Sequence, residues 1–352
     1  MARQLAFGLD TFGDVTVDPD GRRLDEAQVI RDVVDEAVLA DRVGVDVIGV
    51  GEHHRQDFAI SSPETVLAAI AGRTERIRLG SAVTVLSSDD PVRVYQRFAT
   101  LDAVSGGRAE VILGRGSFIE SFPLFGFELD QYEELFEEKL GLFAELQREQ
   151  PVTWSGHTRA PLRGQQVYPR TSAGLTTWVG VGGSPQSVVR AARYGMPLMI
   201  AIIGGESVRF RPFVDLYQRM LREFDQPQLP VGVHSPGHVA DTDEQALAEL
   251  WPHWRAMRDR IGAERGWGPT TTAEFERMAG PDGALYAGSP RTVAAKIART
   301  VRALDASRFA LKYSAGTLPH GLMMASIERY GTEVIPEVRR LLADEAEPAA
   351  AR

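Results

Sequence analysis

The sequence predicts an α/β protein whose strands close into a (β/α)8 barrel. Short runs of apolar and β-branched residues alternate with longer segments whose apolar residues recur at helical spacing. Eight such runs occur at even spacing, and no linker divides them into two groups. This alternation implies a parallel sheet, and eight units close a barrel. An open, doubly wound sheet is the alternative, which the even spacing and the missing linker disfavour.

Local signals mark the ends of the predicted elements. Asp25 caps the first helix and Gly44 ends it, whereas Pro63 and Pro91 each open a helix and the glycines at 106–107 end the second of these. The predicted strands are residues 5–9, 45–50, 77–85, 109–113, 177–181, 198–203, 231–239 and 309–313. The predicted helices are residues 26–43, 63–71, 91–104, 131–148, 187–194, 208–224, 244–261, 289–304 and 319–342.

Other segments depart from this repeat. Residues 1–343 are expected to form one barrel domain with insertions, and the Ala- and Glu-rich residues 344–352 a disordered tail. Residues 151–169 are expected to be an excursion outside the repeat. Residues 262–286 contain several Gly and Pro residues, and they are expected to form either a lid over the barrel mouth or a plain surface loop.

The composition excludes several classes of function. A formal net charge of −9 argues against general binding to nucleic acid or to anionic membranes. The chain has no cysteine, which excludes disulfides, thiolate metal sites and cysteine nucleophiles. The first residues lack the apolar region of a signal peptide, and no apolar run approaches ~18 residues. We therefore expect a soluble, cytoplasmic protein.

Two adjacent histidines follow the second predicted strand. The run at 47–51 ends in glycine and leads directly into Glu52, His53 and His54. Active sites of (β/α)8 barrels lie at the carboxyl ends of the strands, so these side chains are candidates for chemistry. Packing of either histidine within the loop is an equally simple interpretation. A metal site is not expected, because adjacent residues on a strand point to opposite sides.

Two glycine-rich loops are candidates for binding an anion. Gly114, Arg115 and Gly116 follow the fourth strand, and residues 182–184 follow the fifth and lead into a helix. Glycine lets backbone amides approach an anion, arginine pairs with phosphate oxygens, and a helix N-terminus favours negative charge. Both loops open onto the same end of a barrel, so the sequence predicts a phosphate site there. The chain has no G-x-x-x-x-G-K-[ST] motif, which excludes a P-loop.

These motifs together resemble the bacterial luciferase-like, flavin-dependent monooxygenase family. The resemblance covers nearly the whole chain, and each motif is loose, but their order and spacing are specific. The matching segments are residues 44–54, 79–83, 90–93, 101–108, 114–116, 182–184 and 287–290.

The resemblance implies a luciferase-like barrel that binds FMN without a covalent bond. It implies that the FMN phosphate lies between Arg115 and the loop of Gly182, Gly183 and Ser184. It also implies a cis non-proline peptide between Ala82 and Val83, which supports the flavin ring. In full, the implied cofactor-binding residues are Ala82, Val83, Thr84, Gly114, Arg115, Gly116, Gly182, Gly183 and Ser184.

The implied catalytic residues are His53, as a general base or as a stabiliser of the reacting flavin, and its neighbour His54. One departure from the family is clear. The luciferase α subunit has a reactive cysteine beside the flavin, and the matching position here is Gly114. Oxidation of long-chain aldehydes with light emission is therefore not expected.

The resulting interpretation is an FMN-dependent oxidoreductase, a monooxygenase that uses reduced flavin and O2 on a small organic substrate. A separate reductase, or NAD(P)H used directly, would supply the electrons. Three alternatives remain, namely a deazaflavin-dependent hydride-transfer enzyme, a flavin-binding protein without catalysis and a sugar-phosphate barrel enzyme. A homodimer is also expected, through the small residues of the helix at 63–72 and the apolar residues Val94, Phe98, Ala99 and Leu101 of the next helix.

Overall fold

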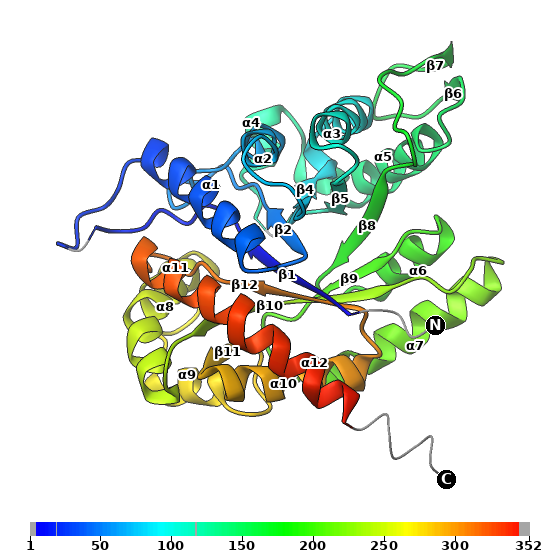
Figure 1. Cartoon of the computed structure of the whole chain (residues 1–352). Coiled ribbons are helices and arrows are strands. Elements are labelled where there is room, and N and C mark those ends of the chain that lie inside the picture. Colours follow the sequence, from blue (N-terminus) through cyan, green and yellow to red (C-terminus); the bar gives the residue numbers. More distant parts are fainter. Residues whose placement is uncertain (1–4, 19, 117, 345–352) are drawn as a thin grey trace, which may run out of the picture.

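Eight parallel strands form a closed barrel in the computed structural model, which describes residues 5–18, 20–116 and 118–344 (Figure 1). Neighbouring strands follow the order β1-β2-β3-β5-β8-β9-β10-β12, and β12 pairs with β1 to close the ring. The (β/α)8 barrel predicted from the sequence is therefore confirmed. The barrel strands are β1 (Ala6–Thr11), β2 (Val47–Val50), β3 (Arg78–Ser81), β5 (Ala109–Gly114), β8 (Thr176–Val181), β9 (Leu198–Ala201), β10 (Val231–Val239) and β12 (Arg308–Lys312).

Helices surround the strands on the outside of the barrel (Figure 1). No helix in the described part of the chain is long and apolar enough to cross a membrane. The α-helices are α1 (Glu26–Arg42), α2 (Pro63–Ala71), α3 (Pro91–Ser105), α4 (Ser121–Phe125), α5 (Tyr132–Leu146), α6 (Pro185–Arg193), α7 (Arg211–Glu223), α8 (Asp243–Arg265), α9 (Thr272–Ala279), α10 (Pro290–Leu304), α11 (His320–Arg329) and α12 (Ile335–Ala343). Short 3₁₀ turns lie at Leu86–Ser88, Leu129–Gln131 and Ser207–Phe210, and a π-helical turn at Tyr330–Val334 joins α11 to α12.

The helix ends follow from the caps that the sequence contains. The side chain of Asp25 accepts a hydrogen bond from the backbone N–H of Gln28, 2.8 Å away, at the start of α1. At the end of α3, Gly106 adopts a φ of 70°, a conformation that glycine takes without steric cost. Both boundaries agree with the sequence analysis.

The expected excursion at 151–169 contains secondary structure. Residues 151–169 hold the antiparallel pair β6 (Val152–Trp154) and β7 (Leu162–Gln165), which stands apart from the barrel (Figure 1). Two further short strands, β4 (Thr84–Val85) and β11 (Tyr286–Gly288), pair with β5 and β10.

The segment at 262–286 is not a plain loop, and its role as a lid over the barrel mouth stays a prediction. Its middle forms α9, which is capped by the side chain of Thr271 accepting from the backbone N–H of Glu274. Phe275 of α9 is buried in the core against Trp251. The sequence analysis missed the Thr-x-x-Glu capping signature at 271–274.

The surface expected to form a dimer is only partly available. Val94, Phe98, Ala99 and Leu101 of α3 are buried inside the chain's own core, so the prediction that they face a partner is wrong. Burial against the barrel and neighbouring helices, rather than a second subunit, explains why they are apolar. The small residues Ala68 and Ala69 of α2 and the capping Gly72, in contrast, are exposed.

A buried ion pair lies near the amino ends of the strands, opposite the end where barrel active sites lie. Arg308 of β12 donates to Glu110 of β5, and both residues are only 1% exposed. Arg78 of β3 approaches the same carboxylate at 3.4 Å, and the Arg308 guanidinium lies 5.3 Å from the ring centre of Trp178. Removing one partner of such a pair leaves an uncompensated buried charge.

Glu110→Ala should therefore destabilise the fold strongly, by about 3–5 kcal/mol in the free energy of unfolding. Denaturant unfolding followed by circular dichroism measures the change. The matched control is Asp215→Ala, which breaks the solvent-exposed pair of Asp215 with Arg211 in α7 and should cost less than about 1 kcal/mol. Equal losses in the two variants would contradict this account of the buried pair.

Candidate functional site

A cavity of about 580 Å³ lies at the carboxyl ends of the barrel strands. This volume is in the range of sites for small molecules and cofactors. Nine of the eleven residues predicted for the site line it: His53, Ala82, Val83, Gly114, Arg115, Gly116, Gly182, Gly183 and Ser184. The closed barrel thus brings together loops that are far apart in the sequence.

Thr84 and His54 are not among the lining residues, although the sequence analysis included both. The Thr84 side chain is 1% exposed, and its hydroxyl donates to Ser81 Oγ at 2.9 Å. His54 points away from the cavity, with its ring 4.9 Å from that of Phe125 and its Nε2 3.7 Å from Glu52. Of the two neighbours in this loop, His53 lines the cavity and His54 does not.

One end of the cavity has the form of an anion cradle. The loop after β8 leads into α6, whose first turn is capped by Ser184 accepting from the Ser187 backbone N–H. A Cβ atom placed on Gly182 or Gly183 would meet no atom within 4 Å, and Gly183 has a φ of +136°. Open space beside backbone amides at a helix N-terminus suits a phosphate or similar anion.

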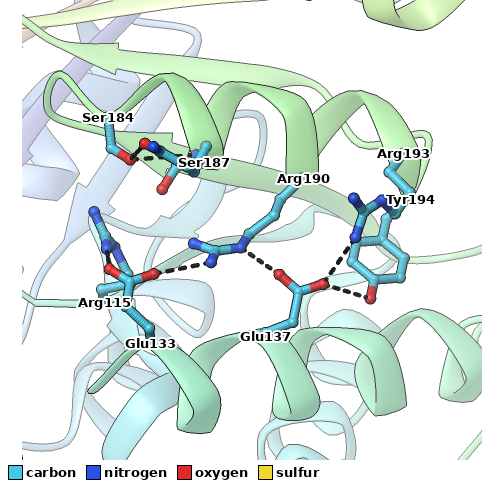
Figure 2. A network of polar contacts seen from close by, with 9 residues as sticks. Arg115, Glu133, Glu137, Ser184, Ser187, Arg190, Arg193 and Tyr194 are labelled. Atoms are coloured by element: carbon cyan, nitrogen blue, oxygen red, sulfur yellow. Dashed lines mark hydrogen bonds and ion pairs between the residues drawn. The ribbon is translucent and has the colours of Figure 1, made fainter. Parts of the chain in front are cut away.

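Arg115 lies beside this cradle and belongs to a chain of ion pairs (Figure 2). Its guanidinium donates to Glu133 of α5, and the other oxygen of Glu133 accepts from Arg190 of α6 at 2.8 Å. Arg190 also donates to Glu137, which accepts from Arg193 at 3.2 Å. Because Glu133 is 58% exposed, Arg115 is held next to the cavity by a partner that solvent or a ligand can replace.

The middle of the cavity wall is formed by close backbone packing. The peptide bond between Ala82 and Val83 is cis, at the position that the family resemblance implied. A Cβ on Gly114 would lie 2.5 Å from Val83 Cγ2, so any larger residue at position 114 would displace Val83. The same contact gives a physical reason for glycine where the luciferase α subunit has cysteine.

His53 is enclosed by aromatic rings. Its ring centre lies 4.8 Å from Phe12, 4.5 Å from Phe58 and 4.8 Å from Phe118. Burial lowers the pKa of His53 to about 3, and the nearby cations Lys312 and Arg55 act in the same direction. His53 is therefore a neutral imidazole at ordinary pH.

Several lining residues were missed by the sequence analysis. Asp10 comes from the end of β1, and Lys312 from the end of β12. His234 lies inside β10, where it donates from Nδ1 to Asp10 at 2.6 Å. An acidic residue at the end of the first apolar run was a usable signal for Asp10, since the same reasoning singled out Glu52. A lone histidine inside a strand gave no such signal.

A group of surface residues could also approach a cation. Ligand atoms of Glu134, Glu138 and His157 lie within 4.8 Å of one another. Glu138, however, already accepts hydrogen bonds from the backbone of His157 and from Thr158. These contacts explain the cluster as a fastening between α5 and the excursion at 151–169.

Comparison with known proteins identifies the family. The model of the luciferase-like monooxygenase family matches residues 11–307. The chain belongs to this family. It is an oxidoreductase of the luciferase-like monooxygenase class, as the resemblance implied. It is 31% identical to the 4-hydroxyprotoasukamycin monooxygenase of Streptomyces nodosus subsp. asukaensis, over 68% of this chain and 67% of that protein.

Solved structures share the fold at lower identity. The oxygenating constituent of 3,6-diketocamphane monooxygenase from Pseudomonas putida, solved in complex with FMN, has a TM-score of 0.75 at 18% identity, covering 95% of this chain and 99% of that one. An F420-dependent secondary alcohol dehydrogenase has a TM-score of 0.72 at 16% identity, covering 96% and 99%. The family fold therefore accommodates different flavin-type cofactors.

The lowered pKa of His53 predicts a pH dependence of stability. Below its ordinary pKa of 6.5, the unfolded chain binds a proton at His53 that the folded chain rejects until pH falls to about 3. The free energy of unfolding should decrease as pH falls through this window, and His53→Gln should remove that contribution. As pH is lowered from 7 to 4, the melting temperature of His53→Gln should therefore fall less than that of the unaltered protein.

His320→Gln is the control, because its expected effect has the opposite sign. A hydrogen bond to Glu36 raises the pKa of His320. This pair stabilises the fold fully below pH 6.5 and is lost as pH rises through the raised value. His320→Gln should therefore lower the melting temperature most at acidic pH. Parallel pH profiles for the two variants would contradict the environments described for these histidines.

Proposed function

We propose that this protein is an FMN-dependent monooxygenase that uses reduced flavin and O2 on a small organic substrate. The observation that carries the proposal is the anion cradle, with Arg115 beside it, at one end of a cavity whose other walls are largely apolar. FMN combines a phosphate group with a flat apolar ring, and the cavity offers a matching part for each. We also propose that residues 1–343 act as one luciferase-like barrel domain; residues 345–352 of the expected tail lie outside the described residues.

The residues that would hold FMN follow from the site geometry. Arg115 and the backbone amides of Gly183 and Ser184 would bind the phosphate, and the wall at Ala82 and Val83 would support the ring. Reduced FMN with O2 supplies the oxidising power when it is bound. The protein's own contribution is to bind and orient the reactants, to exclude water and to supply hydrogen bonds. Electrons for the flavin would come from a separate reductase or directly from NAD(P)H.

His53 would act beside the flavin as a neutral imidazole. Its depressed pKa makes it a weak proton acceptor, so we assign it hydrogen bonding to the reacting groups rather than storage of a proton. Phe12, Phe58 and Phe118 around it limit the access of water.

A deazaflavin-dependent hydride transfer is the second candidate, because the F420-dependent dehydrogenase shares the fold. Titration of the purified protein with FMN and with F420, followed by fluorescence, separates the two. Tight binding of FMN but not F420 supports the proposal, and the reverse result replaces it. Flavin binding without oxygen consumption, when reduced FMN and a panel of organic substrates are supplied, would indicate a flavin-binding protein without catalysis.

Arg115→Ala should weaken FMN binding roughly ten- to a hundredfold, because a charged hydrogen bond contributes ~1.5–3 kcal/mol. Fluorescence titration measures the dissociation constant. The matched control is Arg193→Ala, since Arg193 belongs to the same chain of ion pairs but does not line the cavity. If both variants bind FMN like the unaltered protein, Arg115 has no place in the phosphate site.

His53→Ala should lower the rate of substrate oxidation by ~10²–10³-fold while FMN remains bound, as is typical when one preorganised hydrogen-bonding group is lost. His54→Ala is the matched control, because His54 lies outside the cavity. Single-turnover oxidation of the reduced flavin measures the rate. An unchanged rate in His53→Ala would remove this residue from the reaction.

We also propose a homodimer through the exposed small residues Ala68 and Ala69 of α2 and Gly72, which caps its end. Small side chains allow close approach of two helices, and two-fold dimers are the commonest oligomers. Light scattering at micromolar concentration should give twice the chain mass of 38.6 kDa. Ala68→Glu should return the protein to a monomer, whereas a monomer in the unaltered protein would rule the dimer out.

A further inference from the structure

A second histidine faces the cavity, and a carboxylate fixes its orientation. His234 of β10 lies with its Nδ1 2.6 Å from Oδ2 of Asp10 on β1, and both residues are buried lining residues. A carboxylate accepts hydrogen bonds, so in the neutral imidazole Nδ1 carries the proton and Nε2 has the lone pair. Within the described residues Nε2 has no hydrogen-bond partner, and this atom is left to face the cavity.

The carboxylate of Asp10 has a second oxygen without a partner. Oδ1 of Asp10 is buried and makes no hydrogen bond with the described residues. The side chain fits there because β2 has glycine opposite: a Cβ on Gly49 would overlap this carboxylate. An unpaired acceptor in such a place is costly. Because Oδ1 is buried against β2, the acceptor that remains for a ligand at this wall is Nε2 of His234.

The nearest cation does not change this conclusion. Lys312 also lines the cavity, but its ammonium group donates to both oxygens of Asp14, at 2.9 and 3.1 Å, and to Ser314. A ligand group that arrives at this wall should therefore carry a hydrogen-bond donor. Phe12, whose ring stacks on His234 with centres 6.3 Å apart, and Met199 and Ile203 offer an apolar surface for a flat body.

We propose that Asp10 and His234 form the proton acceptor for the substrate, and that the substrate carries an acidic hydroxyl group on an unsaturated carbon, as in a phenol or an enol. The substrate O–H bond breaks, its proton moves to Nε2 of His234, and the electron pair stays on the substrate oxygen. Asp10 stabilises the resulting imidazolium, as the carboxylate does in serine hydrolase triads. The electron-rich oxyanion form is the form activated for reaction with an oxidant.

This inference rests on the proposed function and names its substrate class. It also gives the two histidines different roles: His53 donates or accepts hydrogen bonds beside the flavin, and His234 accepts the substrate proton. His53 lies 4.8 Å from the Phe12 ring centre and His234 lies 6.3 Å from it. The other ionisable residues that line the cavity are Glu52, Arg115, Tyr132 and Lys312. Of the two lining histidines, His234 is the one paired with a carboxylate.

The test uses 4-nitrophenol, whose absorption spectrum distinguishes the phenol from the phenolate. The FMN-loaded protein is titrated at a pH where the free compound is mainly protonated, and difference spectra are recorded. 4-Nitroanisole, which has no donor, and 4-nitroaniline, which has a donor that is not acidic, are compared. We expect 4-nitrophenol to bind as the phenolate and roughly ten- to a hundredfold more tightly than either analogue.

His234→Gln should abolish the phenolate signal and weaken binding by a similar factor. Asp10→Asn keeps the shape of the side chain but removes its charge, so ionisation of the bound phenol should require higher pH. The matched control is His253→Gln, because His253 of α8 bonds to Thr317 and does not line the cavity. This control should keep the signal and its pH profile, and melting curves show that each variant is folded.

Three results would overturn the inference: 4-nitrophenol bound as the neutral phenol, 4-nitroaniline bound equally well, or no binding of any of the three compounds. A phenolate signal retained in both His234→Gln and Asp10→Asn would do the same. The FMN titration of the same samples distinguishes failure of the proposed function from failure of the assignment of Asp10 and His234. Failure of FMN to bind overturns the proposed function, whereas FMN binding without a phenolate signal overturns only the assignment of Asp10 and His234.

Discussion

Parallel pairing of β1 with β12 and with β2 is the constraint on which the site depends. This pairing closes the barrel and places Asp10 next to Lys312 on one side and Gly49 on the other. Two charged side chains therefore enter the barrel interior at one level. They fit because Gly49 has no side chain. A methyl group at position 49 would collide with the Asp10 carboxylate. The strand pairing that closes the barrel thus also brings these ionisable side chains together at its carboxyl end.

Pairing of charges then determines the character of each end of the barrel. Near the amino ends of the strands, Arg308 and Glu110 lie in the interior against Trp178. Near the carboxyl ends, Lys312 is neutralised by Asp14. Such pairs are costly to break and contribute little net stability when intact, so their effect is on specificity of packing and on the local field. The cavity wall that remains is apolar, with a few oriented polar atoms.

The fold could be predicted from the sequence because its signals are local and repeated. Eight apolar runs, the proline helix starts and the caps at Asp25 and Gly106 all describe the structure. Helix α9 was missed since the surrounding glycines and prolines masked the cap at Thr271. The apolar face of α3 was assigned to a partner because periodicity shows that a face is buried and not what buries it.

The candidate site could be predicted only where a motif accompanied the residue. His53, Arg115 and the glycines at 182–183 lie at strand ends in recognisable loops, and all of them line the cavity. His54 was included because the family resemblance implied a role for it beside His53, and its ring lies outside the cavity against Phe125. His234 and Asp10 are 224 positions apart in sequence, and their contact exists only once β1 and β10 lie in the same closed sheet. Pairs created by barrel closure leave no trace in local sequence.

The pairing of Arg115 with Glu133 also affects how an anion would enter the cradle. The arginine is already neutralised, so an arriving anion exchanges one ion pair for another instead of meeting a bare positive charge. Such an exchange leaves Glu133 paired with Arg190, and its side chain is already 58% exposed to solvent. Dissolved salt screens the old contact as well as the new one, so the two effects partly cancel. Occupancy of the proposed phosphate site should therefore change little with ionic strength.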